Sequence, residues 1–472
     1  MASTTFQERV RKAVVDETLR AALRKVQGNF RIKRTTALAD MDRLAAEGLT
    51  LGTREQLKAQ GREIRAHVVQ HLDAYLKQAA DSIRARGGHV HYAANGLDVG
   101  QIVKQICTAT GARLLIKSKS MATEEVHLNG VLQAAGMNVI ETDLGEYIIQ
   151  VAGETPSHLI APAIHKNKQQ VAETLSKVSE SPLPANTEIL TQFARGKLRD
   201  AFLTADVGVS GANFVVAETG TIILVTNEGN GRMVTSLPKT HIAVVGFEKV
   251  IPTLEDAAVL ISLLPRSATG QKLSVYTSMV TGPRGAGELD GPEELHVIFM
   301  DNGRTNIVGT EFEEMLYCIR CAACVNVCPV YGNIGGHAYG SVYSGPIGAV
   351  LTPLLNGLEE WKDLPYASSL CGACTEACPV GIHLHDHLLN LRKRAVAEHH
   401  VSRTEALIMK FWGWAWSSPA RYRLMASVAR VAQKVSGGWY PPPIANWTKS
   451  RDFPQVAGKL FRERWDEING AD

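Results

Sequence analysis

Seven of the eight cysteines of this chain lie between Cys318 and Cys378, and only Cys107 lies elsewhere. Four of them occur in CIRCAACVNVCP, residues 318–329, and three in LCGACTEACP, residues 370–379, each motif ending in proline. Disulfide frameworks are typical of small secreted domains, whereas local cysteine clusters in a long chain more often bind metal or perform redox chemistry. In a chain of 472 residues the crowding therefore predicts metal binding.

The cysteine spacing indicates iron–sulfur clusters. It matches the bacterial signature C-x2-C-x2-C-x3-C-P, in which the fourth cysteine ligates the other cluster. Zinc is the alternative, but zinc motifs rarely stack three cysteines at intervals of three before C-P. The crossed rule predicts one cluster on Cys318, Cys321, Cys324 and Cys378, and a second on Cys328, Cys371 and Cys374.

The second site lacks one thiolate. Aligning the two motifs places Ser368 where the missing cysteine would be. The site could be a three-iron cluster, 3Fe–4S, or a four-iron cluster with Ser368, water or another residue on one iron. We favour two 4Fe–4S clusters, with the fourth ligand of the second left unassigned.

Periodicity divides the chain into four parts. Residues 1–85 have helical spacing, residues 86–300 alternate strands with helices, residues 301–400 carry the cysteines, and residues 401–472 are helical with a Pro- and Trp-bearing docking stretch. The expected strands are 89–93, 113–118, 138–143, 148–152, 214–218, 221–227, 241–248 and 273–278. Several are wholly apolar, which predicts an α/β layer with a largely parallel sheet. The long spacer between the two motifs favours a helical ferredoxin module.

A glycine-rich stretch, residues 211–246, is the candidate site of the α/β region. Gly229 and Gly231 could expose backbone N–H groups, and Arg232 and Lys239 add positive charge, so this stretch could bind a carboxylate or phosphate. The alternative is a hairpin whose glycines only satisfy positive φ. Glu218 could be a catalytic carboxylate, although a structural hydrogen bond is favoured, and no catalytic residue is assigned.

A second polar segment, Lys117–Ser120, follows an expected strand. Loops at the ends of strands are the usual ligand-binding places in an open α/β sheet. No G-x-G-x-x-G opens a helix after a strand, so a dinucleotide site of the Rossmann type is not supported.

Other residues favour structural roles. We expect Cys107 in the core, and His383, His385 and His387 at the surface or beside the cluster ligands. The aromatic residues of 411–431 could contact a membrane surface or a partner subunit, or pack on the ferredoxin region.

Composition excludes several classes of protein. A net charge of +3 gives no support to nucleic-acid binding. No secretory signal and no run of roughly 18 apolar residues occurs, so we expect no membrane span and a cytoplasmic location, where thiols stay reduced.

Four segments together resemble one family. SKSMATEEVHLN, AETGTIILVTNEGNGRMVTSLPKTHIAVVG, YCIRCAACVNVCPVY and SLCGACTEACPV are similar to lactate-utilisation protein B, the iron–sulfur subunit of the bacterial L-lactate oxidation complex. The resemblance implies an α/β domain like the sugar-phosphate isomerase and CoA-transferase fold, followed by a helical two-cluster ferredoxin domain. The family's seven cluster cysteines are all present, and the gap at Ser368 belongs to the family pattern.

The resemblance also implies a function: electron transfer, with two companion subunits and a downstream acceptor, in a complex that oxidises L-lactate to pyruvate and allows growth on lactate. Such a subunit would not be active alone. Two alternatives stay open: electron transfer for another 2-hydroxy acid such as glycolate, and an acyl- or phosphate-handling enzyme with structural clusters. Peripheral association with a membrane is a further expectation.

Overall fold

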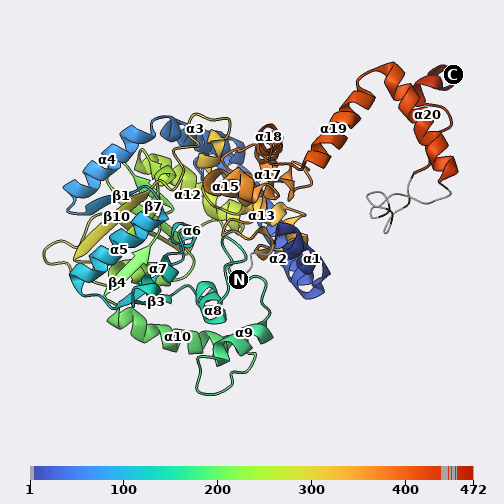
Figure 1. The fold of residues 1–472 in the computed structure, drawn as a ribbon. Helices are drawn as coiled ribbons and strands as arrows, with labels where there is room; N and C mark the ends of the chain where they lie inside the picture. Colours follow the sequence, from blue (N-terminus) through green and yellow to red (C-terminus); the bar gives the residue numbers. More distant parts are fainter. Residues whose placement is uncertain (1–4, 437–444, 446–447, 449–451, 453, 471–472) are drawn as a thin grey trace. The chain divides into compact units, whose positions relative to one another are not determined.

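The computed structural model describes residues 5–436, 445, 448, 452 and 454–470. The chain forms two compact units, Met1–Arg394 and Ala395–Asp472. The first unit contains the α/β region and both cysteine motifs (Figure 1). The stretch of residues 437–454, expected to be a docking segment, lies mostly outside the described residues.

The centre of the first unit is a six-stranded sheet with strand order β1-β10-β7-β4-β2-β3. Every neighbouring pair is parallel, which confirms the expected sheet type. The strands are β1 (His89–Ala93), β2 (Leu114–Lys117), β3 (Asn138–Glu141), β4 (Val207–Ser210), β7 (Thr240–Gly246) and β10 (Glu294–Met300). β2 and β4 are neighbours, but β2 connects towards β3 and β4 towards β7. Ligands of open parallel sheets bind beyond the carboxyl ends of the strands at such a switch point.

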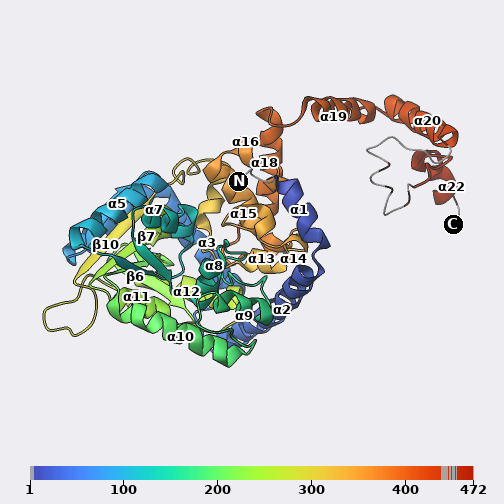
Figure 2. The ribbon, with the colours of Figure 1, turned by 60° about the horizontal axis from the view of Figure 1, so that its bottom comes forward.

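Both faces of this sheet are buried, as β7 shows. Its residues Ile242 and Val244 pack with α5 (Gly96–Thr110) and α7 (Leu128–Ala134), whereas Ala243 and Val245 pack on the other face with α4 (Leu72–Ala85). Successive strand residues point to opposite faces, so a strand covered on both sides is apolar throughout. Figures 1 and 2 show α5 and α7 lying over one face of the sheet.

Two expectations about local structure are wrong. Residues 148–152 belong to helix α8 (Leu144–Ala152), because Asp143 caps its start by accepting from the N–H groups of Gly145 and Glu146, and Gly153 ends it with φ of 69°. The loop after residue 227 is no hairpin: helix α11 (Asn230–Ser236) follows it, and the flanking strands β6 and β7 belong to different sheets.

A second sheet of four strands packs beside the first, with order β8-β5-β6-β9. Its strands are β5 (Phe214–Val216), β6 (Thr221–Thr226), β8 (Val250–Ile251) and β9 (Tyr276–Val280). The remaining helices of the α/β region and the amino-terminal segment are α1 (Phe6–Val15), α2 (Glu17–Ala46), α3 (Arg54–Gln70), α6 (Met121–Glu125), α9 (Lys168–Ser176), α10 (Thr187–Thr204) and α12 (Leu254–Ala268).

The cysteine region has short helices and, between residues 301 and 400, no described strand. Its helices are α13 (Ala323–Val327), α14 (Tyr331–Ile334), α15 (Gly345–Asn356), α16 (Leu358–Trp361), α17 (Ala373–Glu376) and α18 (Leu384–Ala397), with 3-10 turns at Glu313–Tyr317, His337–Tyr339 and Leu364–Tyr366. This agrees with the expected helical ferredoxin module.

The regular structure of the second unit is helical where it is described. It contains α19 (Arg403–Trp416), α20 (Pro419–Val435), the 3-10 turn Phe461–Glu463 and α22 (Trp465–Asn469). Across the described part of the chain, no helix combines the length and the apolar character that crossing a membrane requires.

Candidate functional site

The two cysteine motifs fold into the same local backbone. In the first, Arg320 and Ala322 have φ of 59° and 60°, and in the second the aligned residues Leu370 and Gly372 have φ of 53° and 78°. Residues other than glycine rarely adopt a left-handed backbone. Its occurrence at two matching positions in both motifs therefore reflects the shape of the loop and not the preference of the residue types. The two segments are therefore structural repeats, although only one carries a full set of cysteines.

Ser368 stands where the first repeat has Cys318. The N–H of Arg320 donates to Cys318 Sγ over 3.4 Å, and the N–H of Leu370 donates to Ser368 Oγ over 3.0 Å. Each bond links a side chain to the backbone two residues further on. The alignment made from the sequence thus places the serine hydroxyl at the position of a thiol.

The first predicted ligand set is brought together. Cys318, Cys321, Cys324 and Cys378 line one small cavity of about 20 Å³, closed by apolar side chains such as Ile347. Burial, helped by the neighbouring Cys378 thiol, raises the pKa of Cys321 to about 12. Four crowded thiols, three of them buried, are poorly suited to hold charge alone, whereas iron would stabilise their thiolates.

The second predicted set also gathers, with Cys328 and Cys374 buried and only Cys371 at the surface. Burial raises the pKa of Cys328 to about 11, and the nearby Cys374 and Cys371 thiols add to this shift. Cys371 is exposed, and a hydrogen bond from the Ala373 backbone lowers its pKa. The donor set of three thiols and a serine hydroxyl fits a cluster that lies close to solvent.

Buried charges connect the first cysteine loop to the α/β region. Glu248, after β7, pairs with Arg304 and with Arg320 of the loop, whose Nη2 lies 3.3 Å from Glu248 Oε1. Arg304 also pairs with Glu125 over 2.8 Å. Although burial opposes it, the two guanidinium groups lower the pKa of Glu248 to about 2. The sequence carries no signal for this network, because its members lie far apart in the chain.

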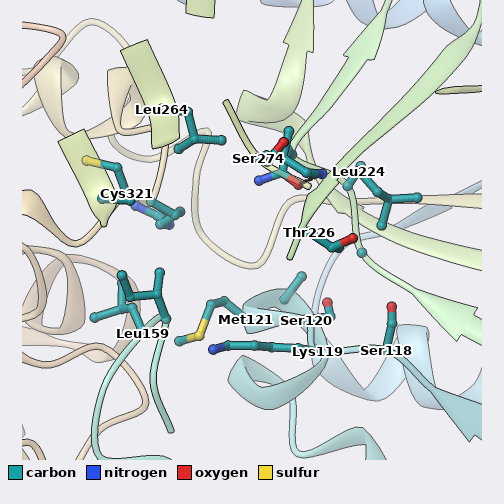
Figure 3. A pocket seen from close by; sticks show the side chains of 18 of the residues that line it. Ser118, Lys119, Ser120, Met121, Leu159, Leu224, Thr226, Leu264, Ser274 and Cys321 are labelled. Carbon is teal, nitrogen blue, oxygen red and sulfur yellow. Dashed lines mark hydrogen bonds between the residues drawn. The ribbon is translucent and has the colours of Figure 1, made fainter. Parts of the chain in front are cut away.

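A cavity of about 330 Å³ lies beyond the carboxyl ends of β2, β4 and β7. Figure 3 shows Ser118, Lys119 and Ser120 along one side of it, facing Leu264 and Ser274, with Cys321 at one end. The first cluster site and the cavity therefore share a wall. Of the four residues in the predicted ligand loop Lys117–Ser120, the last three line this wall.

Polar groups of this cavity lack partners. Lys119 and Lys249 line it and form no hydrogen bond or ion pair with any described residue, and Ser118 Oγ and Arg320 Nη1 are buried without a hydrogen-bond partner. Burial lowers the pKa of Lys119, and burial together with Arg320 lowers that of Lys249 to about 7. By contrast Lys117, which does not line the cavity, lies 2.8 Å from both Glu124 and Glu141.

The residues expected to bind an anion lie elsewhere. Arg232 and Lys239 are exposed, and Lys239 precedes β7, so it is at the amino end of that strand. Gly229 and Gly231 form the start of α11. Glu218 is exposed and accepts a hydrogen bond from the N–H of Leu254 over 2.9 Å. An anion site at these residues stays a prediction.

The remaining candidate side chains have structural partners. Cys107 is fully buried in the core. His383 and His387 contact Glu314, and His385 Nδ1 lies 2.7 Å from Thr375 Oγ1.

Outside the cysteines, Glu154, His165 and His337 form a group with metal-ligand spacing among the described residues. Lys166 Nζ already lies 2.6 Å from Glu154, so we assign no metal there.

Family models match three consecutive parts of the chain. They are the LUD domain at residues 76–300, the 4Fe-4S dicluster domain at 314–382 and the C-terminal domain of Lactate utilisation protein B at 391–469. The gathered cysteines and the dicluster match agree, and the chain carries two 4Fe–4S clusters. A solved DUF162 family protein from Deinococcus radiodurans is 18% identical, spans 48% of this chain and 98% of its own, and has a TM-score of 0.28.

Relatives match over nearly the full length. The Lactate utilization protein B of Shouchella clausii is 48% identical and covers 97% of this chain and 96% of its own. That of Bacillus subtilis is 46% identical and covers 97% and 95%. The chain therefore belongs to the lactate utilization protein B family of iron–sulfur proteins.

Proposed function

We propose that this chain is the electron-transfer subunit of a cytoplasmic complex that oxidises L-lactate to pyruvate, acting with two companion subunits and a downstream acceptor. The observation that carries the proposal is the gathering of Cys318, Cys321, Cys324 and Cys378 around one cavity, with a second set that reaches the surface through Cys371 alone. One enclosed site and one site that reaches the surface are what an electron relay needs.

Each cysteine set has a role in this proposal. Cys318, Cys321, Cys324 and Cys378 hold the first cluster, and Cys328, Cys371 and Cys374 hold the second. Ser368 fills the fourth position of the second site, because its hydroxyl takes the backbone hydrogen bond that Cys318 takes in the first repeat. Bound clusters would supply one-electron transfer.

The chain's own residues shape the two sites differently. Ile347, Val380 and Leu384 exclude water from the first, whereas the exposed Cys371 leaves the second accessible to another protein. Lactate oxidation removes two electrons as a hydride equivalent, so a two-electron centre must precede a one-electron relay. The sequence has no G-x-G-x-x-G fingerprint, so we assign that step to a companion subunit.

The test starts with anaerobically purified protein. About eight irons and matching sulfide per chain, with reduced four-iron signals in electron paramagnetic resonance, are expected. L-lactate should then reduce the clusters only when both companion subunits are present. Zinc without sulfide would refute the relay, and faster reduction by glycolate than by lactate would change the substrate.

A further inference from the structure

The cavity beyond the sheet has features of a built ligand site that the electron relay alone does not require. It lies at the switch point between β2 and β4, and its volume of about 330 Å³ is at the lower end of the range for small-molecule sites. Ser118 Oγ and Arg320 Nη1 are buried in its wall without a hydrogen-bond partner, and the half-buried Lys119 and the buried Lys249 form no hydrogen bond or ion pair with a described residue. Unpaired buried polar groups are costly, so a protein that keeps several around one cavity indicates a ligand.

The charged side chains in the wall indicate which charge that ligand carries. Four cationic side chains, Lys119, Lys249, Arg304 and Arg320, face three carboxylates, Asp143, Glu228 and Glu248. Glu125, which pairs with Arg304 from outside the wall, adds a fourth carboxylate, so the charges balance over the cavity as a whole and only their distribution can favour an anion.

The charges are unevenly distributed along the cavity. Near Lys119 are Asp143 and Glu228, which already compensate its charge. At the Lys249 end three cations, Lys249, Arg304 and Arg320, face two carboxylates: Glu248, which pairs with both guanidinium groups, and Glu125, which pairs with Arg304. A local excess of positive charge therefore lies at the Lys249 end, where Cys321 of the first cluster site forms part of the wall.

The rest of the wall suits a small acid with an apolar end. Leu159, Leu224, Val244 and Leu264 line the cavity, with Met121 beside them. A ligand pocket of this type uses apolar walls for shape and a few placed polar groups for orientation.

We propose that this cavity binds a small monocarboxylate of the 2-hydroxy or 2-oxo acid class, with its carboxylate on Lys249 and Arg320 and its 2-oxygen towards Lys119 and Ser118. The inference rests on the proposed function for the choice of acid. It adds that the substrate or product of the complex binds this chain directly, against the wall of the first cluster. The proposed site is beyond the carboxyl ends of the strands and is separate from the predicted one at Arg232 and Lys239.

The experiment is a binding titration of the anaerobic protein with both clusters loaded and without companion subunits. L-lactate and pyruvate are titrated by calorimetry, with inorganic phosphate and the uncharged lactamide as probes of class. We expect saturable binding of the two acids, weaker binding of phosphate and none of lactamide. A second readout is a change in the resonance spectrum of the reduced first cluster when acid is added, because the two sites share Cys321.

Variants locate the carboxylate. Lys249→Met should weaken binding at least about tenfold, the range expected for a charge-assisted hydrogen bond, and Lys249→Arg should restore part of it. Lys119→Met should have a smaller effect, about threefold. Lys104→Met, an exposed lysine of α5, is the matched control and should bind like the wild type. Iron content shows that each variant has folded.

Three results would overturn the inference. They are no binding of either acid by the wild type, binding to Lys249→Met as tight as to wild type, and tighter binding of phosphate than of both acids. If the complete complex still reduced the clusters with lactate in any of these cases, the proposed function would stand and only the cavity assignment would fall. If acids bound but the complex passed no electrons to the clusters, the opposite would hold.

Discussion

The two cysteine loops have the same backbone but opposite surroundings. Both place left-handed residues at matching positions, and both direct a side chain to the N–H two residues further on. The first loop is clamped by Arg320, which pairs with Glu248 and stacks on Tyr343 at 4.8 Å, and its cysteines line a closed cavity. The second exposes Cys371 and has serine in place of one cysteine.

In the proposed relay, this difference lets one motif form both ends. Backbone geometry is set by the local spacing, so it repeats, whereas burial and charge come from distant parts of the chain. The α/β region surrounds the first loop and provides a cavity beside it, but leaves the second loop open. We therefore expect substitutions around the first loop to affect folding, and those around the second to affect cluster composition.

The largest effect should follow from breaking the buried charge network that holds Arg320 of the first loop. Arg304→Met leaves Glu125 and Glu248 buried without their main partner, which should lower the free energy of unfolding by about 3–5 kcal/mol. Urea unfolding of the first unit in the full chain measures it.

Arg392→Met is the matched substitution at the second loop. Arg392 donates to the carbonyl of Pro365 over 3.0 Å and stacks on Tyr366, both near the surface. We expect a loss of only about 1 kcal/mol. Equal losses in the two variants would contradict the contrast between a clamped loop and an open one.

The next prediction concerns the missing thiol. Ser368→Cys should make the second loop equivalent to the first, because the serine hydroxyl already has the place of a thiol. After brief exposure to air we expect about eight irons per chain to remain in the variant, whereas wild type should fall to about seven and show a three-iron signal.

Ser369→Cys introduces the same thiol one residue away and should behave like wild type. Resonance spectra of the three proteins, recorded side by side, make the comparison. If Ser369→Cys protected the cluster equally well, position 368 would have no special role.

A smaller effect is expected at Glu314, which joins the two loops. It precedes the first loop and contacts His383 and His387 after the second. Although burial opposes it, hydrogen bonds from the His383 N–H and from Arg62 lower the pKa of Glu314 to about 2. A carboxyl whose folded pKa is depressed stabilises the fold above its unfolded pKa of 4.5, and this is lost as pH falls towards 2.

Unfolding of the apoprotein by urea between about pH 5 and pH 3 tests this sign. Glu314→Gln should make the acid loss of stability less steep than in wild type. Glu359→Gln, an exposed residue of α16, should not. An identical pH dependence in all three proteins would show that Glu314 does not join the loops energetically.

Features fixed by local sequence were predictable. The parallel sheet follows from wholly apolar runs such as Ile242–Val245, and the cysteine sets follow from spacing alone. The expected strands do not include β4 or β10, and residues 148–152 form a helix instead of a strand. There the apolar pair Ile148 and Ile149 suits either structure, and the cap at Asp143 decides for the helix.

The cavity was only partly predictable. Lys119 follows a strand, which is a sequence signal for a ligand loop. Lys249 follows β7 and Arg304 follows β10, so the strand order brings them to one edge, whereas Arg320 comes from the first cysteine loop, which packs against that edge. In the sequence, the exposed Arg232 cannot be told from a cation that lines a cavity. Burial and pairing distinguish a solvent-screened cation from an unpaired one, and both depend on the whole fold.

The amino-terminal helices pack on the part of the first unit that is made last. Gln27 donates to the carbonyls of Val325 and Cys328, and Arg34 to that of Ala377, across 298 to 343 residues of chain. At about 5–20 residues per second, a ribosome needs roughly 15 to 70 seconds to span that distance. During this interval the cysteine loops have not been synthesised, and the surfaces of the helices that will pack on them are exposed to solvent. We therefore expect iron to reach the first loop before these helices cover it, whereas the exposed Cys371 keeps the second loop accessible in the folded chain.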